Sequence, residues 1–401
     1  MTGTTRRTTV AALLTAGFAG RARAQAVLPV KIGVLTDQNG ALSDLSGSGS
    51  IEAVRMAVAD FGGSVLGRPV EVVFADHQNK PEIAVSVALQ WLDSAGVEMI
   101  TDLVNSSVAL AVQDLARTRG KITLSSTGGT LALMGKQCSA TGAVWANDTY
   151  SASVGLVRYF LRQQGKKRWF LIGADYAFGH SMVEQAAKAI QAGGGSVMGT
   201  IFHPLGTADM TSYLLTAQSS GAEAILFGNA SSDLVASVKQ AREMGLTQTL
   251  AATVVTVLDI RAMGLQAAQG LTYLTSFYWD WDDQTRAFSK RFFARHRAMP
   301  TQFQAGGYST TLTYLKAVQA AGTTDGAKVM QEIHRMKVED VFSRNGHVRI
   351  DGRLVHDMLI AQVKQPGQST GGWDVCNVID VLPGDQVFRP LSESDCPLVR
   401  A

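Results

Sequence analysis

The sequence predicts an α/β protein built from two doubly wound parallel-sheet lobes that are joined by a hinge of several crossovers. Short apolar runs alternate with amphipathic stretches from residue 30 to about residue 130, and the alternation starts again after residue 150. Because parallel strands need a helix-length connection, this order predicts parallel sheets with right-handed crossovers. Several apolar runs end in loops of small polar residues, which is typical of the ligand crevice of such sheets.

Length and composition agree with two globular domains. The chain has 401 residues, of which 46% are hydrophobic and 17% are charged. This composition excludes a disordered or highly charged protein, and the length allows two well-buried cores.

Residues 1–24 have the features of a secretory signal peptide. A basic start at Arg6 and Arg7 precedes an apolar run from Val10 to Ala19, and Ala22-Arg23-Ala24 forms a small-x-small cleavage site. The apolar run is too short to span a bilayer. No cysteine follows the cleavage site, so we expect export to the periplasm without a lipid anchor, by a route that the sequence leaves open.

The basic character of the chain comes mostly from this segment. The formal net charge is +3, and the segment carries four arginines and no acidic residue, so its removal leaves −1. The remaining sequence has no basic stripe and no apolar run of membrane-spanning length. We therefore expect neither nucleic acid nor a membrane as a direct partner.

In the first half of the chain, each predicted strand is followed by a predicted helix. The residue types and their spacing predict strands at 30–36, 70–75, 97–103 and 122–125, and helices at 51–61, 81–92 and 108–117. Gly62-Gly63 ends the first helix, and Pro81 opens the second.

The second half repeats this order and then becomes less regular. We predict helices at 150–162, 182–190, 210–217 and 234–244, and strands at 169–173, 197–202, 224–227 and 250–255. Residues 271–279 are strand-like, three helical stretches begin near residues 283, 308 and 325, and long strands return at 354–364 and 375–382. We expect residues 27–147 with 276–341 to form lobe 1, and residues 148–275 with 342–401 to form lobe 2 and a tail.

The motifs of the common enzyme classes are missing. Gly47-Ser48-Gly49-Ser50 lacks the third glycine of a dinucleotide fingerprint, and its loop is too long for that turn. The sequence has no phosphate-binding loop and no glycine-flanked nucleophilic serine. Its seven histidines show no metal-ligand spacing. We therefore expect no catalytic residues, no metal and no cofactor.

Small polar and aromatic residues cluster instead in loops that follow predicted strands. These loops lie at 105–107, 127–129, 145–150, 175–179 and 229–233. They supply hydrogen-bond donors and aromatic walls, but no nucleophile–base pair. Each has a structural alternative. Asn105 or Ser106 would also cap a helix, and Asp233 would also cap the helix at 234. Gly128-Gly129 would also make a turn, Trp145 and Tyr150 would also pack in a hinge, and Phe178 would also fill a core.

The three cysteines allow one disulfide and one free thiol. Export places Cys138, Cys376 and Cys396 in an oxidising compartment. Cys376 and Cys396 are close in sequence, which favours their pairing by loop closure, whereas Cys138 with Cys396 would tie the tail to the body. The sequence alone leaves both pairings open.

The chain from residue 30 to residue 391 resembles the type I periplasmic solute-binding proteins of ABC importers. It is most similar to the branched-chain-amino-acid-binding type and to its relatives that bind aromatic acids. The resemblance rests on the segments 105–112 (NSSVALAV), 148–150 (DTY), 176–179 (YAFG), 203–205 (HPL), 277–280 (FYWD) and 304–309 (QAGGYS).

The resemblance implies two lobes, joined by three crossovers, that close on a small molecule. It places the ligand carboxylate on the first lobe, at Asn105, Ser106, Ser107, Thr127, Gly128 and Gly129. It brings Phe178, Asn229, Ala230 and Thr253 to the ligand from the second lobe, with Trp145, Asp148 and Tyr150 near the hinge. It also implies a disulfide between Cys138 and Cys396.

The resemblance further implies a receptor that delivers its ligand to a permease in the inner membrane. Phe178 stands where tyrosine is common in the family, and no carboxylate lies within residues 253–256. Both departures favour a carboxylate without an amino group, such as an aromatic acid whose ring would lie between Trp145, Tyr150 and Phe178. An amino acid is the other ligand class. We expect a monomer. The alternatives are a ligand sensor that reports to a regulator and, less favoured, an NAD-dependent dehydrogenase.

Overall fold

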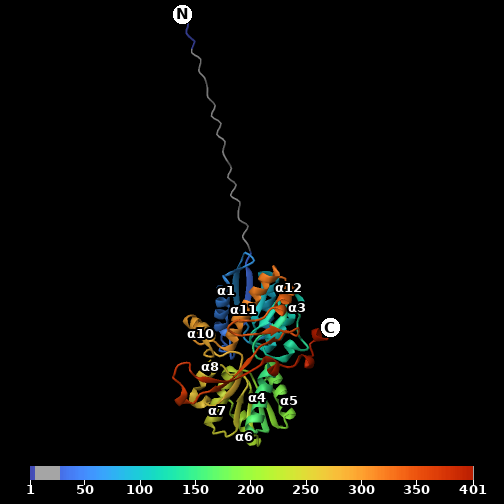
Figure 1. Cartoon of the computed structure of the whole chain (residues 1–401), viewed down its shortest axis with the longest axis vertical. Coiled ribbons are helices and arrows are strands. Elements are labelled where there is room, and N and C mark those ends of the chain that lie inside the picture. Colours follow the sequence, from blue (N-terminus) through green and yellow to red (C-terminus); the bar gives the residue numbers. More distant parts are fainter. Residues whose placement is uncertain (5–27, 401) are drawn as a thin grey trace.

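The structure is a computed structural model that describes residues 1–4 and 28–400. Except for its first four residues, the predicted signal peptide therefore lies outside the described residues. The described chain forms two α/β lobes that follow one another along the long axis of the molecule (Figure 1). None of its helices combines the length and the apolar character that a bilayer span requires.

The first lobe is organised around a six-stranded sheet with the strand order β2-β3-β1-β4-β5-β6. All neighbours are parallel except β2 and β3, which form an antiparallel pair. The strands are β1 (Val30–Thr36), β2 (Ser64–Val65), β3 (Arg68–Asp76), β4 (Val97–Asp102), β5 (Ile122–Ser125) and β6 (Gly142–Val144). The predicted parallel sheet of this lobe is thus confirmed, with β2 and β6 added by the structure.

Helices from both halves of the chain cover this sheet. They are α1 (Gly47–Phe61), α2 (Pro81–Gln90), α3 (Ser106–Thr118), α10 (Asp283–His296), α11 (Gln302–Ala321) and α12 (Gly326–Arg335). Helix α11 packs against α1 and also meets the sheet, where the hydroxyls of Thr101 on β4 and Thr310 lie 3.0 Å apart. It begins at residue 302, before the predicted 308, because the Thr301 side chain caps it by accepting from the amide of Gln304.

The second lobe contains a parallel four-stranded sheet in the order β10-β9-β7-β8. Its strands are β7 (Arg168–Ala174), β8 (Ser196–His203), β9 (Ala224–Gly228) and β10 (Thr249–Ala252). Its helices are α4 (Thr149–Gln164), α5 (Ala177–Ala192), α6 (Thr211–Ser219), α7 (Ser231–Glu243), α8 (Val257–Met263) and α9 (Leu265–Ala268).

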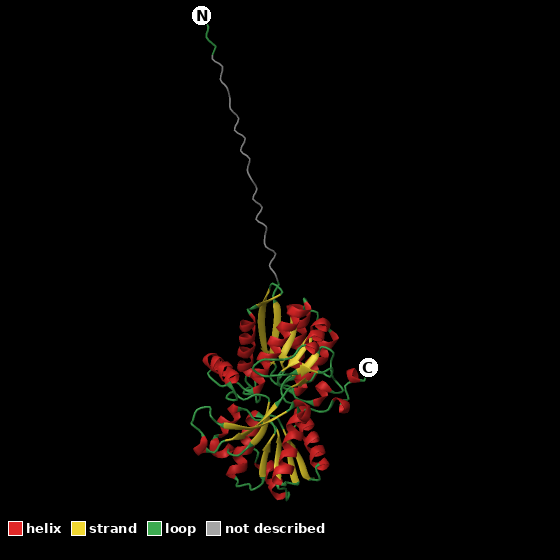
Figure 2. Cartoon of the chain, in the orientation of Figure 1, coloured by secondary structure: helices red, strands yellow, loops and turns green. Residues whose placement is uncertain are grey.

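A smaller antiparallel sheet lies at the junction between the lobes and has the order β11-β14-β15. Its strands are β11 (Thr272–Thr275), β14 (Met358–Val363) and β15 (Cys376–Leu382), and a separate hairpin pairs β12 (His347–Val348) with β13 (Leu354–Val355). Figure 2 shows these strands between the two main sheets.

Several strand predictions were too long. The strand predicted at 250–255 ends at Ala252. The strand predicted at 271–279 ends at Thr275, because the Thr275 hydroxyl donates to the carbonyl of Phe277, two residues further on, and the chain turns there. The strand predicted at 354–364 is broken between Val355 and Met358.

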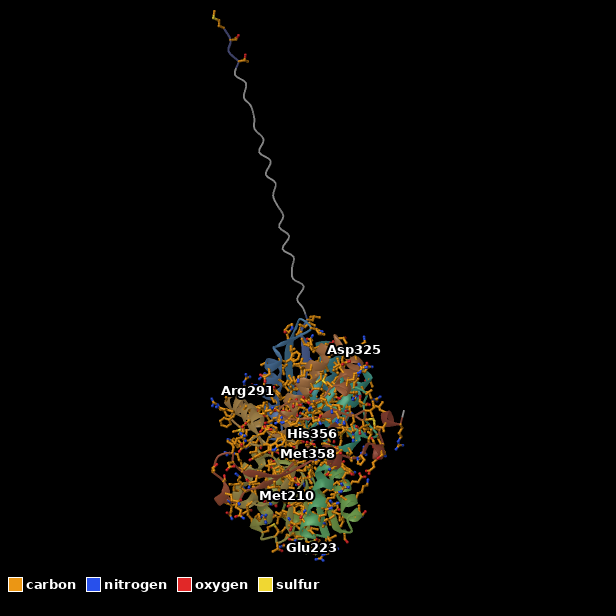
Figure 3. All side chains as sticks on the ribbon, viewed as in Figure 1. Met210, Glu223, Arg291, Asp325, His356 and Met358 are labelled. Atoms are coloured by element: carbon orange, nitrogen blue, oxygen red, sulfur yellow. A yellow bond between two sulfur atoms is a disulfide. The ribbon has the colours of Figure 1, made fainter. Side chains whose placement is uncertain are left out.

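We propose that the chain passes between the lobes near residues 145–148, 276–282 and 355–358, at the ends of β6, β11 and β13. Phe342, Val348 and Leu354 belong to the apolar core of the first lobe, and Val144 on β6 forms a bridge with Arg353. We therefore propose that the last crossing follows Val355, rather than lying at the expected residue 342. Figure 3 labels His356 and Met358 at this crossing, between the two lobes.

The buried side chain of Arg353 links two of the crossings. Its guanidinium donates to the carbonyl oxygen of Trp145, and its Nη1 lies 3.4 Å from Oδ2 of Asp148. The ring of Phe388 from the tail lies 4.4 Å from the guanidinium carbon, measured to the ring centroid. Burial lowers the pKa of Arg353 to about 10, so the side chain keeps its charge at neutral pH.

The tail returns to the first lobe after β15. A disulfide joins Cys138 to Cys396 across 258 residues of sequence, which is the pair that the resemblance implies. Cys376 is a buried free thiol, 3.3 Å from the hydroxyl of Tyr273. The tail is thus a further, covalently anchored connection over the hinge.

Candidate functional site

Loops at the carboxyl ends of strands in both lobes meet at one interface, which we call the cleft. One apolar cluster contains Val104 of the first lobe together with Ala230 and Val254 of the second. Helix α3 also contacts α5, and the Ser232 hydroxyl lies 3.4 Å from the carbonyl oxygen of Ala41 at the cleft rim. The described conformation is therefore a closed one, and its interface has an apolar centre.

The N-terminus of α3 opens into the cleft from the first lobe. The Asn105 side chain caps this helix, with Oδ1 accepting from the amides of Ser107 (2.9 Å) and Val108 (3.3 Å). The backbone amide of Ser106 finds no acceptor among the described residues. Free amides at a helix N-terminus favour an anion. Asn105 thus shapes the site while the amide of Ser106 is free to donate.

The loop that follows β5 presents its backbone, rather than its hydroxyl groups, for binding. The Thr127 hydroxyl donates to the carbonyl oxygen of Asp102 at 2.6 Å, and the amide of Gly128 donates to the Ser125 hydroxyl at 2.9 Å. Within the described chain, the amides of Thr127 and Gly129 have no acceptor. Together with the Ser106 amide they form a set of three unpaired donors, which we call the amide cradle.

Glycine at position 128 allows this loop to approach α3 closely. A Cβ at this position would lie 2.8 Å from Cβ of Ala109 and 3.1 Å from the carbonyl oxygen of Leu103. A larger residue would push the loop away from α3, so Gly128 has a steric role and contributes no free amide.

A buried acid, Asp102, lies next to the amide cradle. It ends β4 with a positive φ of 76°, and its Oδ1 lies 3.0 Å from the Thr127 hydroxyl. Its Oδ2 has no partner in the described part of the chain. Burial raises the pKa of Asp102 to about 6, against the opposing effect of hydroxyl groups around the carboxyl. The acid is thus ready to carry a proton near neutral pH.

The second lobe offers mainly an apolar wall. Phe178 on α5 packs on the shared apolar cluster and stacks on Tyr176, with ring centroids 5.9 Å apart and planes inclined by 27°. Ala230 and Val254 continue this surface. Such a wall suits an aromatic or branched aliphatic group.

Polar atoms of the second lobe are arranged around His203. Nδ1 of His203 lies 2.9 Å from the carbonyl oxygen of Pro204, and Nε2 lies 3.0 Å from the amide nitrogen of Asn229. The same amide nitrogen reaches the Ser237 hydroxyl, so Oδ1 of Asn229 is left without a partner in the described chain. The Thr253 hydroxyl donates to the carbonyl oxygen of Phe227. Asn229 therefore presents an acceptor, and Thr253 supports the sheet edge.

Asp233 adds a second unpaired acceptor beside Asn229. Its Oδ2 accepts from the amide of Gly206 at 3.1 Å, whereas its Oδ1 has no partner among the described residues. Burial raises the pKa of Asp233, and burial together with the Asp233 charge raises the pKa of Tyr176. The second lobe thus presents oxygen acceptors where the first presents amide donors.

Three of the expected site residues lie outside this cleft. Trp145 is fully buried in the first-lobe core, and its indole nitrogen donates to Ser309 on α11 at 2.9 Å. Asp148 caps α4 through the amide of Ser151 and contacts Arg353, so both of its oxygens are used within the chain. Tyr150 lines an outer groove of about 340 Å³ between α4, α5 and the tail. The structure thus brings Phe178, but neither Trp145 nor Tyr150, to the cleft.

Sequence reasoning missed Asp102, and it gave no binding role to Tyr176, His203 and Asp233, although Tyr176 and Asp233 lie in two of the predicted loops. One signal for Asp102 was present, because an acidic residue inside the apolar run 97–104 must be buried unless the strand is exposed. The unpaired atoms of Asn229 and Asp233 depend on contacts with distant residues, which no local pattern reveals.

The described residues contain no group of three or more histidine, cysteine or acidic side chains that could hold a metal ion. The amide cradle and the apolar wall suit an organic anion.

Comparisons with known proteins agree with this geometry. The model of the periplasmic binding protein family matches residues 29–371. A periplasmic binding protein from Burkholderia mallei has 41% sequence identity and a TM-score of 0.90, over 92% of this chain and 99% of that one. A branched-chain amino acid ABC transporter periplasmic ligand-binding protein from Burkholderia xenovorans LB400 has 40% identity and a TM-score of 0.83, over 92% of this chain and 100% of that one.

A more distant solved structure has the same fold. It is a solute-binding protein of an ABC transporter from R. palustris in complex with benzoate, with 18% identity and a TM-score of 0.82 over 92% of this chain and 100% of that one. The family model spans most of the chain, and the Burkholderia structures are matched along nearly their whole length. This chain therefore belongs to the periplasmic binding protein family and is a solute-binding receptor of the ABC-transporter type.

Proposed function

We propose that the protein binds a small organic carboxylate between its lobes and delivers it to an ABC permease in the inner membrane. The amide cradle of Ser106, Thr127 and Gly129 carries the proposal, because unpaired backbone donors at the N-terminus of α3 and in the loop after β5 match a carboxylate. The contacts between the lobes fit a ligand that stabilises closure by touching both of them.

An aromatic acid is the ligand class that the apolar wall favours. The face formed by Phe178, Tyr176 and Val254 suits a flat ring, and the distant relative from R. palustris holds benzoate.

A branched-chain or other amino acid is the second class. The unpaired oxygens of Asn229 and Asp233 favour a ligand with hydrogen-bond donors at the end away from its carboxylate, and the 40%-identical relative serves branched-chain amino acid transport. A hydroxylated aromatic acid would combine both features.

The proposal also covers the oligomeric state, the lack of enzymatic activity and the location of the protein. We propose a monomer without enzymatic activity that works in the periplasm after removal of residues 1–24. The same fold would also serve a sensor that reports to a regulator, and ligand-dependent binding to a permease would separate the two roles.

A thermal-unfolding screen followed by calorimetry tests the function. The purified mature chain is screened against benzoate, hydroxybenzoates, branched-chain amino acids, dicarboxylates and amides. A true ligand at a hundred times its Kd should stabilise the fold by about 2.7 kcal/mol. Product formed from any of these compounds with nicotinamide cofactors, or stabilisation by the amides alone, would contradict the proposal.

A further inference from the structure

Asp102 is a buried carboxyl group that the proposed binding of a ligand does not itself use. Its side chain is fully buried at the end of β4, opposite Leu35 of β1. The hydroxyls of Thr36, Ser46, Ser50 and Thr127 surround the carboxyl. Its Oδ2 and the Ser50 hydroxyl oxygen are two buried polar atoms without a partner in the part of the chain that the structure describes.

The hydrogen bonds around Thr127 indicate where a proton is needed. The Thr127 hydroxyl has a single proton and lies 2.6 Å from the carbonyl oxygen of Asp102 and 3.0 Å from its Oδ1. The carbonyl oxygen can only accept, so the shorter contact takes the hydroxyl proton. The longer contact then becomes a hydrogen bond when the carboxyl group itself carries a proton. A neutral Asp102 therefore completes this network.

No cation compensates the charge of Asp102 within the described chain. Burial raises the pKa of Asp102, four hydroxyl groups oppose this shift, and no lysine or arginine contributes to it. Two titratable residues follow the neighbouring strands β1 and β3. Asp37 accepts from the amides of Gly40 and Leu42. His77 is neutral, because burial lowers its pKa to about 4.

The remaining neighbouring elements also place no compensating charge there. On α1, Glu52 pairs with Arg295 at the surface, at 3.0 Å. On α11, Lys316 is exposed, and the charged residues of α3 lie at its far end. Across the cleft, the titratable groups are Asp233, Tyr176 and His203, and Nδ1 of His203 lies 3.9 Å from Oδ2 of Asp233, so this ring faces the acid of its own lobe. A second negative charge bound near Asp102 would therefore meet no neutralising group.

We propose that Asp102 couples ligand binding to protons: a carboxylate bound to the amide cradle is held while Asp102 is neutral. Thr127 connects the two groups, since its hydroxyl contacts Oδ1 of Asp102 and its amide belongs to the cradle. Two ionised carboxylates this close repel one another in a buried site. Binding to the ionised protein therefore takes up one proton from solvent at Asp102, while the ligand remains a carboxylate. This inference rests on the proposed function.

Isothermal titration calorimetry of the mature protein with benzoate and with L-leucine tests this coupling. Each ligand keeps its ionisation state between about pH 5.5 and about pH 8, so a change in affinity reports on the protein. We expect affinity to weaken as pH rises, by up to about tenfold for each pH unit. Titrations in two buffers of different ionisation enthalpy should show uptake of up to one proton for each ligand bound.

Asp102→Asn is the decisive variant, because the amide keeps the shape and cannot ionise. Asparagine also tolerates the positive φ of this position. We expect this variant to bind with the same affinity throughout the pH range. Asp340→Asn is the matched control: Asp340 is another acid with a raised pKa, held by Ser309 away from the cleft, and its variant should keep the pH dependence of the original protein.

Several outcomes would overturn the inference. Binding of either probe without pH dependence or proton uptake would contradict the coupling and leave the proposed function standing. An affinity that follows sodium concentration instead of pH would mean that a cation neutralises Asp102. Binding of neither probe, nor of any carboxylate in the unfolding screen, would overturn the proposed function and the coupling together. The buffer comparison needs no variant, so it decides the matter even if Asp102→Asn fails to fold.

Discussion

The two sides of the cleft differ in the kind of atom that they leave unpaired. The first lobe presents backbone amides, because the hydroxyl groups of Ser125 and Thr127 already donate hydrogen bonds to the carbonyl oxygen of Asp102. The second lobe presents side chains: the ring of Phe178 and the unpaired oxygens of Asn229 and Asp233. Backbone donors would hold any small carboxylate in the same way. The side chains across the cleft would therefore decide which carboxylate is retained.

On the first-lobe side of the cleft, Trp145 belongs to the core rather than to the ligand wall. Its replacement should have the largest effect of the variants considered, and the effect should be on stability. Trp145→Ala should lower the free energy of unfolding by about 3–5 kcal/mol, because it removes a fully buried indole. Chemical denaturation measures this loss. Trp145→Phe, which keeps most of the volume and loses the bond to Ser309, should cost less. A Trp145→Ala protein of unchanged stability would place this ring at the cleft surface.

The acid in the first lobe predicts a pH-dependent loss of stability of about 3 kcal/mol. The pKa of Asp102 is raised from 3.8 to about 6 in the fold, so its protonated form is favoured. Its contribution is therefore fully present below about pH 4 and is lost as pH rises to about 6. Unfolding of Asp102→Asn and of the original protein should diverge over this interval, with the variant gaining in relative stability. Parallel curves would contradict the raised pKa.

The apolar wall of the second lobe predicts a smaller effect that is confined to binding. Phe178→Ala should weaken the binding of an aromatic ligand about tenfold, because it removes half of a stacked pair. Calorimetry measures the change. Tyr150→Ala is the matched control, since Tyr150 lines the outer groove and its loss should leave the affinity unchanged. If Tyr150→Ala weakened binding more than Phe178→Ala, Tyr150 rather than Phe178 would belong to the apolar wall of the ligand site.

Most of the fold could be predicted because its signals are local. Alternation of apolar runs and amphipathic stretches defined the parallel sheets, and α1 ends at Gly62 as predicted, where the structure adds a left-handed conformation. The limits of β11 and β14 could not be predicted. A side-chain hydrogen bond of Thr275 ends β11, and the crossing between the lobes precedes β14. Neither feature leaves a mark on the periodicity of apolar residues.

The candidate site was predictable only in its loops. The sequence placed Ser106 and Thr127 at strand ends, but which atoms remain free depends on partners that are distant in the chain. The Thr127 hydroxyl is taken by Asp102, 25 residues away, and the Trp145 indole by Ser309, 164 residues away. Residue type alone therefore suggested hydroxyl donors and a tryptophan wall, where the structure has backbone amides and a core tryptophan.

The amide of Ser106 gives the most direct test of the account. Ser106 is the first residue of α3, where proline is tolerated, and Asn105 before it is already extended, with φ −94° and ψ 125°. Ser106→Pro therefore removes one amide donor from an otherwise intact helix, whereas Ser106→Ala removes only the hydroxyl.

The measurement is the calorimetric affinity of both variants for the carboxylate that the screen identifies. Loss of a hydrogen bond to a charged group should cost about 1.5–3 kcal/mol, which is roughly tenfold to a hundredfold in affinity. The account predicts this loss for Ser106→Pro and an affinity close to the original for Ser106→Ala. Equal affinities of the two variants, or a loss confined to Ser106→Ala, would contradict a carboxylate held by the backbone of the first lobe.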